Sequence, residues 1–242
     1  MKSLLRICYL FGVCVLLATC NADEPVEPTL DLGYFPLKVG NYLLYDVQES
    51  TILNGVETKS SYELRSVVTD STKNENGTVT YIIVREKRAS SAIAWQPFET
   101  WSAQLVNNKL IQNESNVLFV KLVFPPSLNV RWNGNEFNNL PDNGNLFNDS
   151  NSDKYEVSQV DANTTLPNGF QAINTLTVTQ NNYDDPFTGK DQRLEVYSKD
   201  IGLAYKETIQ VTYCTSNTSC YGQQFVEKGV ILIQSLKSYG AL

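Results

Sequence analysis

The sequence predicts an all-β fold, an antiparallel meander of about ten strands that forms a curved sheet, a half-barrel or a sandwich. Three observations lead to this prediction. Apolar and polar residues alternate in several short segments, as they do along half-buried strands. Asn54-Gly55 is a strong signal for a two-residue hairpin, because both residues tolerate positive φ angles. The mature part shows no helical period of useful length, so we expect neighbouring strands joined by turns.

The first half of the domain is expected to contain six strands separated by turn-forming residues. Asn107-Asn108 and the polar stretch 73–77 are typical of tight turns, and Pro125-Pro126 ends the last strand. After Asn116, the run 116–124 is apolar except for Lys121, as in a strand that is buried on both faces. The predicted strands cover residues 42–53, 61–67, 78–87, 95–106, 109–113 and 116–124.

The second half begins after the Asn-rich stretch 133–153, which has no period and is predicted to be a long loop. A second loop is expected at 181–191. The clearest alternation is at 203–213, where Leu203, Tyr205 and Ile209 lie on one apolar face that only Glu207 interrupts. Five predicted strands cover residues 154–160, 170–180, 193–198, 203–213 and 225–239.

The first 19 residues have the three parts of an export signal. Lys2 and Arg6 precede an apolar run of 12 residues, and small residues follow. This run is shorter than the ~20 residues that a membrane-spanning helix needs. Leu17-Ala18-Thr19-Cys20 resembles a bacterial lipobox, although Thr19 stands where Gly, Ala or Ser is usual. We therefore predict a lipoprotein signal peptide at 1–19 and lipidation of Cys20. Ordinary signal-peptidase cleavage after Ala22 is the alternative.

Behind Cys20, the sequence contains acidic residues and two prolines with no alternating pattern. Residues 20–32 are therefore predicted to be a solvated tether, and residues 33–242 a single β domain. Acidic residues just behind a lipobox resemble a signal for surface display in some Gram-negative lipoproteins. The expected location is the outer membrane, on its periplasmic or cell-surface face, and a linker with incidental charge is an equally good interpretation.

Charge and composition exclude several classes of function. Removal of the leader takes away Lys2 and Arg6 and leaves 17 basic against 26 acidic residues, a balance of −9. Such a chain lacks the basic surface of a nucleic-acid-binding protein. The sequence contains no His, which excludes Ser-His-Asp triads, Cys-His dyads and His-ligated metals within this chain. We predict no cofactor, no metal site and no catalytic residue.

The cysteines fit an exported protein. Cys8 and Cys14 lie in the leader and Cys20 is the predicted lipid acceptor, so only Cys214 and Cys220 belong to the folded domain. An isolated pair in an exported protein is most simply a disulfide, here within the turn before the last strand. A redox or metal-binding pair is disfavoured, because the spacing is not C-x-x-C and no His is present.

Three phrases resemble a broad group of uncharacterised bacterial lipoproteins. They are Tyr34-Phe35-Pro36-Leu37 with Gly40-Asn41-Tyr42, then Trp132-Asn133-Gly134-Asn135, and Ile201-Gly202-Leu203 with Tyr205-Lys206-Glu207. The group combines a lipobox with a YFPLxxGNYxxY opening and a YxxxIGLxYKE late strand. Leu43 stands where the group tends to have Trp. The resemblance implies an envelope location and a β fold, and it implies no activity or catalytic residue.

Aromatic residues are the best candidates for ligand binding. Trp95, Trp101 and Trp132, with the polar neighbour Asn133, are predicted to stack against a sugar or to line an apolar groove. The alternative is that these side chains only pack in the core, where aromatic residues are favoured. The first functional hypothesis is a non-enzymatic binding or structural module that is lipid-anchored in the membrane. Its partner would be a glycan, an apolar ligand or an envelope protein.

Acidic residues suggest two weaker alternatives. Asp184 and Asp185 are the candidates for a carboxylate-dependent hydrolase such as a glycosidase, which needs two carboxylates across a cleft. Adjacent residues seldom face each other in this way, and Asp before Pro is typical of a turn. Asp149, Asn151 and Asp153 alternate like calcium ligands, but Lys154 replaces the Gly of the EF-hand loop. We expect solvated loops at both places.

Overall fold

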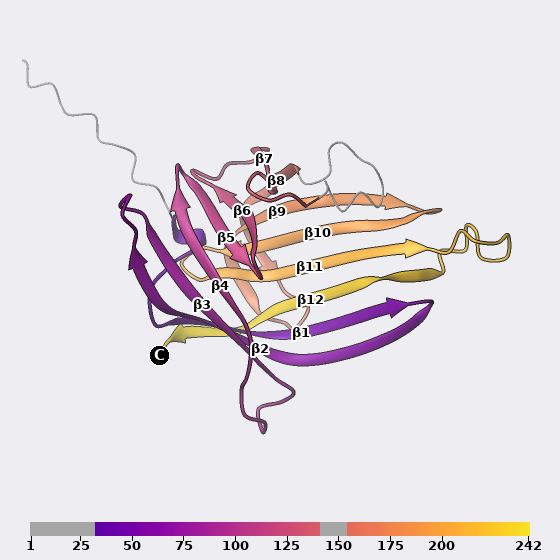
Figure 1. The fold of residues 1–242 in the computed structure, drawn as a ribbon, viewed down its shortest axis with the longest axis horizontal. Helices are drawn as coiled ribbons and strands as arrows, with labels where there is room; N and C mark the ends of the chain where they lie inside the picture. The colour runs from indigo at the N-terminus through magenta and orange to yellow at the C-terminus, as the bar shows by residue number, and fades with distance from the viewer. Residues whose placement is uncertain (1–31, 141–153) are drawn as a thin grey trace, which may run out of the picture.

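Within residues 32–140 and 154–242, twelve antiparallel strands form a single sheet, in which consecutive strands pair except the sixth and the seventh, which are its two edges (Figure 1). The computed structural model describes residues 32–140 and 154–242. The order across the sheet is β6-β5-β4-β3-β2-β1-β12-β11-β10-β9-β8-β7. The first strand therefore pairs with the last one, and two meanders extend from this central pair in opposite directions. The sheet curves until it is nearly closed into a barrel.

A short 3₁₀ turn, η2 (Leu32–Tyr34), precedes the strands. The first meander contains β1 (Asn41–Leu53), β2 (Val56–Lys73), β3 (Val79–Arg88), β4 (Gln96–Val106), β5 (Lys109–Glu114) and β6 (Val117–Val123). The second contains β7 (Arg131–Asn133), β8 (Lys154–Thr165), β9 (Gln171–Asp185), β10 (Gly189–Ser198), β11 (Gly202–Tyr213) and β12 (Val226–Ala241). In Figure 1 the hairpins β1–β2, β9–β10 and β11–β12 reach toward the right, while β3 to β6 cross steeply at the left.

The predicted all-β meander is confirmed, and the turn chemistry explains much of it. Asn54 and Gly55 join β1 to β2 with φ angles of 52° and 74°, and Asn107 and Asn108 join β4 to β5 with 48° and 63°. These are the positive values that a tight hairpin turn requires. Cys214 and Cys220 form the predicted disulfide in the connection between β11 and β12, with their Cα atoms 5.7 Å apart.

The predicted loop at 181–191 is wrong. β9 continues to Asp185 and β10 begins at Gly189, so most of this segment lies in two paired strands. One oxygen of Asp185 accepts hydrogen bonds from the backbone amides of Phe187 (2.8 Å) and Thr188 (2.9 Å) and closes a tight turn. Many side chains here are polar and exposed, and backbone pairing rather than apolar alternation defines the strands. β7 was likewise not predicted, because it has only three residues.

Irregular pairing gives the sheet its curvature. The register shifts between Leu44 and Tyr45 on β1, between Arg85 and Glu86 on β3, and between Val196 and Tyr197 on β10. Such bulges bend a strand and redirect its side chains. Two clusters of buried apolar residues fill the curved sheet. One includes Val120, Leu122, Tyr155, Leu176 and Tyr197, and the other includes Tyr45, Leu64, Val196, Ala204 and Leu236.

The two edges of the sheet meet through a small number of contacts. The backbone amide of Val120 on β6 donates to the carbonyl of Gly134, just after β7, at 2.9 Å. The indole nitrogen of Trp132 donates to the carbonyl of Val120 at 2.7 Å. The Trp132 ring also packs edge-on against Tyr155. These contacts join the first and second meanders on the side opposite to the β1–β12 pair.

Several predictions lie outside the described residues. They concern the signal peptide 1–19, Cys20, the tether up to residue 31, and the polar positions Asp149, Asn151 and Asp153. Across residues 32–140 and 154–242, no helix has the length and apolar character needed to span a membrane.

Replacement of Gly134 should test how tightly the edges are closed. A Cβ atom at this position would lie 2.3 Å from the Tyr155 ring, so Gly134→Ala requires a backbone or ring shift. We expect a loss of ~1–3 kcal/mol in the free energy of unfolding, measured with urea. In the background Tyr155→Leu the same change should cost much less, because the ring is absent. Equal costs in both backgrounds would contradict this explanation.

Candidate functional site

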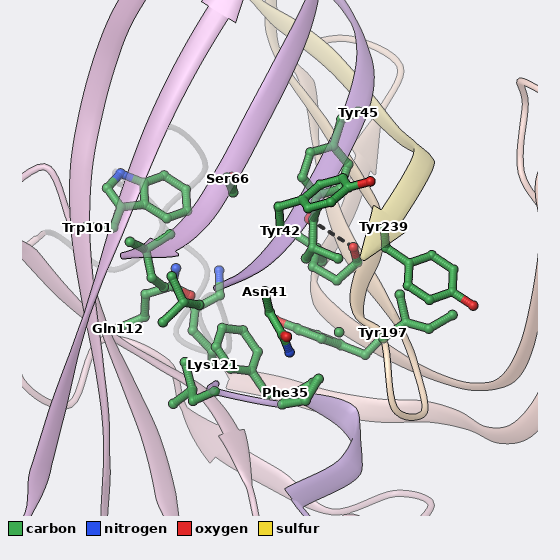
Figure 2. A pocket seen from close by; sticks show the side chains of 18 of the residues that line it. Phe35, Asn41, Tyr42, Tyr45, Ser66, Trp101, Gln112, Lys121, Tyr197 and Tyr239 are labelled. Carbon is green, nitrogen blue, oxygen red and sulfur yellow. Dashed lines mark hydrogen bonds between the residues drawn. The ribbon is translucent and has the colours of Figure 1, made fainter. Parts of the chain in front are cut away.

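A cavity of about 250 Å³ lies inside the curved sheet, beside the start of the domain (Figure 2). Its wall includes the segment 35–37 and side chains from β1 to β6 and from β10 to β12, so both meanders contribute. The cavity combines an apolar wall with a small number of buried charged and amide groups. This combination is typical of small-molecule sites.

Aromatic and aliphatic side chains form most of the wall. Figure 2 shows Phe35, Tyr42, Tyr45, Trp101 and Tyr197 around the cavity, from segments that are far apart in the sequence. The hydroxyl of Tyr45 donates to the backbone carbonyl of Leu203 at 2.9 Å, which ties β1 to β11. The Phe35 and Tyr197 rings lie 6.2 Å apart and are tilted by 52°.

Four charged side chains form the floor of the cavity. The ammonium group of Lys121 on β6 lies 2.6 Å from a carboxylate oxygen of Glu195 on β10 and 3.0 Å from one of Glu114 on β5. Lys206 on β11 lies 3.6 Å from both carboxylates. The hydroxyl of Tyr197 donates to the other oxygen of Glu195. The two positive and two negative charges balance.

The lysines keep both buried glutamates ionised. Burial alone would raise the pKa of Glu114, but the charges of Lys121 and Lys206 outweigh it and lower this pKa to about 2. Glu195 has the same opposing influences, and its pKa is also lowered. Burial acts in the opposite direction on Lys121, yet the two carboxylates raise its pKa above the usual value. All three groups are therefore charged at neutral pH.

A second charged group borders the same cavity. The guanidinium carbon of Arg85 lies 3.6 Å from the centre of the Trp101 ring, a close cation–π contact. Arg85 also donates to Glu99 at 2.6 Å, to the hydroxyl of Ser66 at 3.3 Å and to the side-chain oxygen of Gln234 at 3.5 Å. Glu99 thus balances the charge of Arg85, and the guanidinium group of Arg85 covers one face of the Trp101 ring.

Some polar groups of the cavity retain free hydrogen-bonding capacity. Gln112 is 5% exposed and lines the cavity, and its side-chain amide has no hydrogen-bond partner among the described residues. Gln234 is 3% exposed, and its side-chain oxygen alone is bonded, to Arg85. Figure 2 shows Gln112 and Lys121 on the same side of the cavity. Buried amides without protein partners are uncommon, so these groups are available to a ligand or to water.

The carboxylates of the cavity are unsuited to general acid catalysis. Glu114 and Glu195 both contact Lys121 and are therefore near each other. Two neighbouring carboxylates are also what a glycosidase uses for catalysis. That mechanism needs one carboxyl group that holds its proton near neutral pH because its pKa is raised. Here the pKa of each group is lowered, so neither can donate a proton to a leaving group.

The four predicted ligand-binding residues do not share one site. Trp101 lines the cavity. Trp95 does not line the cavity. Its ring lies against the guanidinium groups of Arg65 (4.7 Å) and Arg88 (4.2 Å). Trp132 is buried at the closing edge, and Asn133 is exposed on β7, where its side chain accepts from the amide of Asn135.

The acids proposed for hydrolysis have structural contacts. Asp184 pairs with Lys190 at 2.7 Å across the β9–β10 hairpin. Asp185 accepts hydrogen bonds from Phe187 and Thr188 within the turn, and these bonds lower its pKa. Both residues are absent from the cavity wall. The turn interpretation of this pair is the one that the geometry supports.

Sequence reasoning did not identify the charged floor, although a signal was present. Lys121 is the one charged residue in the apolar run 116–124, which indicates a lysine that needs buried partners. No pattern pointed to Glu114 or Glu195 as those partners. Glu114 lies on the paired strand β5, and Glu195 lies in the other meander and reaches Lys121 only when the sheet curves.

Comparisons with known proteins give only two distant structural likenesses. No protein-family model and no curated protein matches this chain. It is similar to a solved structure from Bacteroides fragilis described as an exported protein with a YmcC-like fold. The identity is 12%, the match covers 85% of this chain and 98% of that one, and the TM-score is 0.44. A structure from Parabacteroides distasonis, described as a lipoprotein, shows 10% identity, 86% and 98% coverage and a TM-score of 0.40. Both TM-scores are below 0.5, so these likenesses assign neither family nor function.

Replacement of Lys121 should show how much stability is lost when the buried carboxylates have no close positive partner. Lys121→Met leaves Glu114 and Glu195 without their closest partner, and we expect a loss of ~3–5 kcal/mol in the free energy of unfolding at pH 7. Lys109→Met removes a partly exposed pair with Glu136 and should cost no more than ~1 kcal/mol. Urea unfolding of both variants gives the comparison.

The pH dependence of the same variants provides a second check. In the wild type the folded pKa of Glu114 is lowered, so its contribution to stability is present above the ordinary value of 4.5 and is lost as pH falls toward about 2. In Lys121→Met the carboxylates destabilise the fold until they are protonated. The difference between wild type and variant should therefore shrink as pH falls from 7 toward about 2. A constant difference between pH 7 and pH 3 would contradict the proposed role.

Proposed function

We propose that this protein is a non-enzymatic binding module, attached by lipid to the outer membrane, that holds a small ligand in the cavity of its curved sheet. The observation that carries this proposal is the cavity itself. It has an aromatic wall, a neutral set of buried charges, and amide groups of Gln112 and Gln234 that the protein leaves partly unpaired.

Stability alone is a poor explanation for this floor. A buried ion pair contributes little net stability, because desolvation offsets the attraction between the charges, and apolar residues of similar size often do as well. The interior of the sheet contains enough apolar residues elsewhere to form a core. A polar floor under an apolar wall is instead what a binding site requires, because a few fixed polar groups orient the ligand.

The membrane attachment is supported by the sequence. The leader, Cys20 and the acidic tether match a lipoprotein, and the tether of 12 residues after Cys20 spans at most ~40 Å when extended. η2 begins at Leu32, the last residue of the predicted tether, and Phe35 already belongs to the cavity wall. In the proposed arrangement the cavity thus stays within reach of the membrane surface.

A hydrolase receives less support than a binding module. The two carboxylates of the cavity are ionised and held by lysines. Asp184 and Asp185 lie at the end of β9, where Asp184 pairs with Lys190 and Asp185 caps the turn to β10. An enzyme of the glycosidase type would need a protonated carboxyl group in the cavity.

Blocking the cavity should abolish binding. Asn41 lies at the cavity in Figure 2 and is partly exposed, so Asn41→Trp should fill the space with little change in stability. Full-length protein in lipid nanodiscs would be screened by saturation-transfer NMR against neutral sugars, a uronic acid, an amino sugar and octanoate. We expect at least one class to bind, with at least tenfold weaker binding to Asn41→Trp. Thr58→Trp, at an exposed position of β2, is the control and should bind as the wild type does.

Two results would contradict the binding proposal. If none of the four probe classes binds, the proposal that the cavity holds a small ligand is contradicted. Binding that is equal in wild type and Asn41→Trp would place the ligand elsewhere.

Mass spectrometry of the mature N-terminus tests the anchor. We expect an acylated Cys20 at the N-terminus, and Cys20→Ala should release the protein from membranes during fractionation. A mature chain that begins at Asp23 without lipid would show ordinary signal-peptidase cleavage and would contradict the lipoprotein proposal.

A further inference from the structure

We infer that the cavity selects one uncharged, hydroxyl-bearing ring, such as a neutral sugar residue, rather than a charged ligand or an alkyl chain. This inference rests on the proposed binding function and specifies the chemical class of its ligand. Three properties of the cavity lead to it: the balance of its charges, the kind of polar group that is left free, and its size and wall.

The charges of the floor favour a neutral ligand. Lys121 and Lys206 face Glu114 and Glu195, and all contacts among them lie between 2.6 and 3.6 Å. A ligand anion that approached Lys206 would also approach two ionised carboxylates, and a ligand cation would approach two ammonium groups. Attraction and repulsion would largely cancel, while the ligand would still lose its hydration. Arg85 offers no surplus charge, because Glu99 neutralises it. Asp200 also lines the cavity, but it is exposed and its charge is hydrated.

The free polar groups match hydroxyls. The amide of Gln112 presents both a donor and an acceptor, and Gln234 has a free amide nitrogen among the described residues. Lys206 has only loose contacts at 3.6 Å, so its ammonium group can donate to a ligand oxygen. A hydroxyl group both donates and accepts, so one ring with several hydroxyls can satisfy these mixed groups together. An alkyl chain would leave them unpaired, which is unfavourable in a buried site.

The wall and the volume suit a single ring. The cavity of about 250 Å³ corresponds to roughly eight water molecules at liquid density and is smaller than typical drug-sized pockets. Phe35, Tyr42 and Tyr239 supply aromatic surfaces to the wall, and all three are at least partly exposed. A sugar ring has apolar C–H faces and polar edges, so its faces can pack on aromatic rings while its hydroxyls reach the floor.

The test compares matched probes on the full-length protein in nanodiscs. A neutral hexose should bind at least tenfold more tightly than the uronic acid and the amino sugar of the same ring, and octanoate should not compete with it. A neutral trisaccharide tests the source of the ring. Tighter binding than the monosaccharide indicates the end of a glycan chain, and equal binding indicates a free sugar.

A pair of glutamine variants connects the selectivity to the cavity. Gln112→Leu keeps the volume of the side chain and removes its hydrogen bonds, so we expect at least tenfold weaker binding of the neutral hexose. Gln180→Leu is the matched control, because Gln180 is also buried but does not line the cavity, and its amide nitrogen has no partner within the described residues. Gln180→Leu should bind the neutral hexose as tightly as the wild type does. Melting temperatures of both variants show whether they fold.

The outcomes separate this inference from the binding proposal. If octanoate or a charged sugar binds in a manner that Asn41→Trp abolishes, while the neutral hexose does not bind, the cavity is a binding site and the inference about its ligand is wrong. Equal binding of the hexose to wild type and folded Gln112→Leu would also overturn the inference. Absence of binding by every probe would overturn both.

Discussion

The contact between Lys121 and the two glutamates is the interaction on which the interior of this protein depends. Lys121 comes from β6, near one end of the sheet, and Glu195 from β10, in the other meander. Three buried charges can coexist only where each has a partner, because an unpaired charge would lose its hydration without compensation. The two meanders must therefore curve toward each other until these side chains meet, and the space beside them becomes the cavity.

Other features of the sheet make this meeting possible. Bulges beside Tyr45, Arg85 and Tyr197 curve strands at the positions whose side chains line the cavity. The backbone hydrogen bond from Val120 to Gly134 then joins the two edges of the sheet, and Val120 is the residue next to Lys121. Closure and charge pairing thus support each other, since a change in the position of β6 would move both the edge contact and the ammonium group.

The same charges decide what chemistry the cavity can perform. Two adjacent carboxylates in a partly apolar cavity could suggest acid–base catalysis if their pKa values were separated by their surroundings. Here the lysines lower the pKa of Glu114 and of Glu195, so the pair acts as a fixed set of acceptors. This charge-balanced and partly unpaired polar floor is the feature on which the proposed binding function rests.

Local sequence determined the all-β class, most strand positions, the turns at Asn54-Gly55 and Asn107-Asn108, and the disulfide. These features depend on neighbouring residues, on turn chemistry or on the number of cysteines, and the structure confirms each of them. The proposed location rests on residues 1–20, whose sequence resembles a lipoprotein signal peptide followed by Cys20.

Only the tertiary structure brought Lys121, Glu114 and Glu195 together, placed Trp101 at the cavity and separated it from Trp95 and Trp132. The physical reason is that Glu195 comes from the other meander, while Glu114 faces Lys121 across the β5–β6 hairpin. These contacts depend on bulges and curvature, which no local pattern of residues encodes.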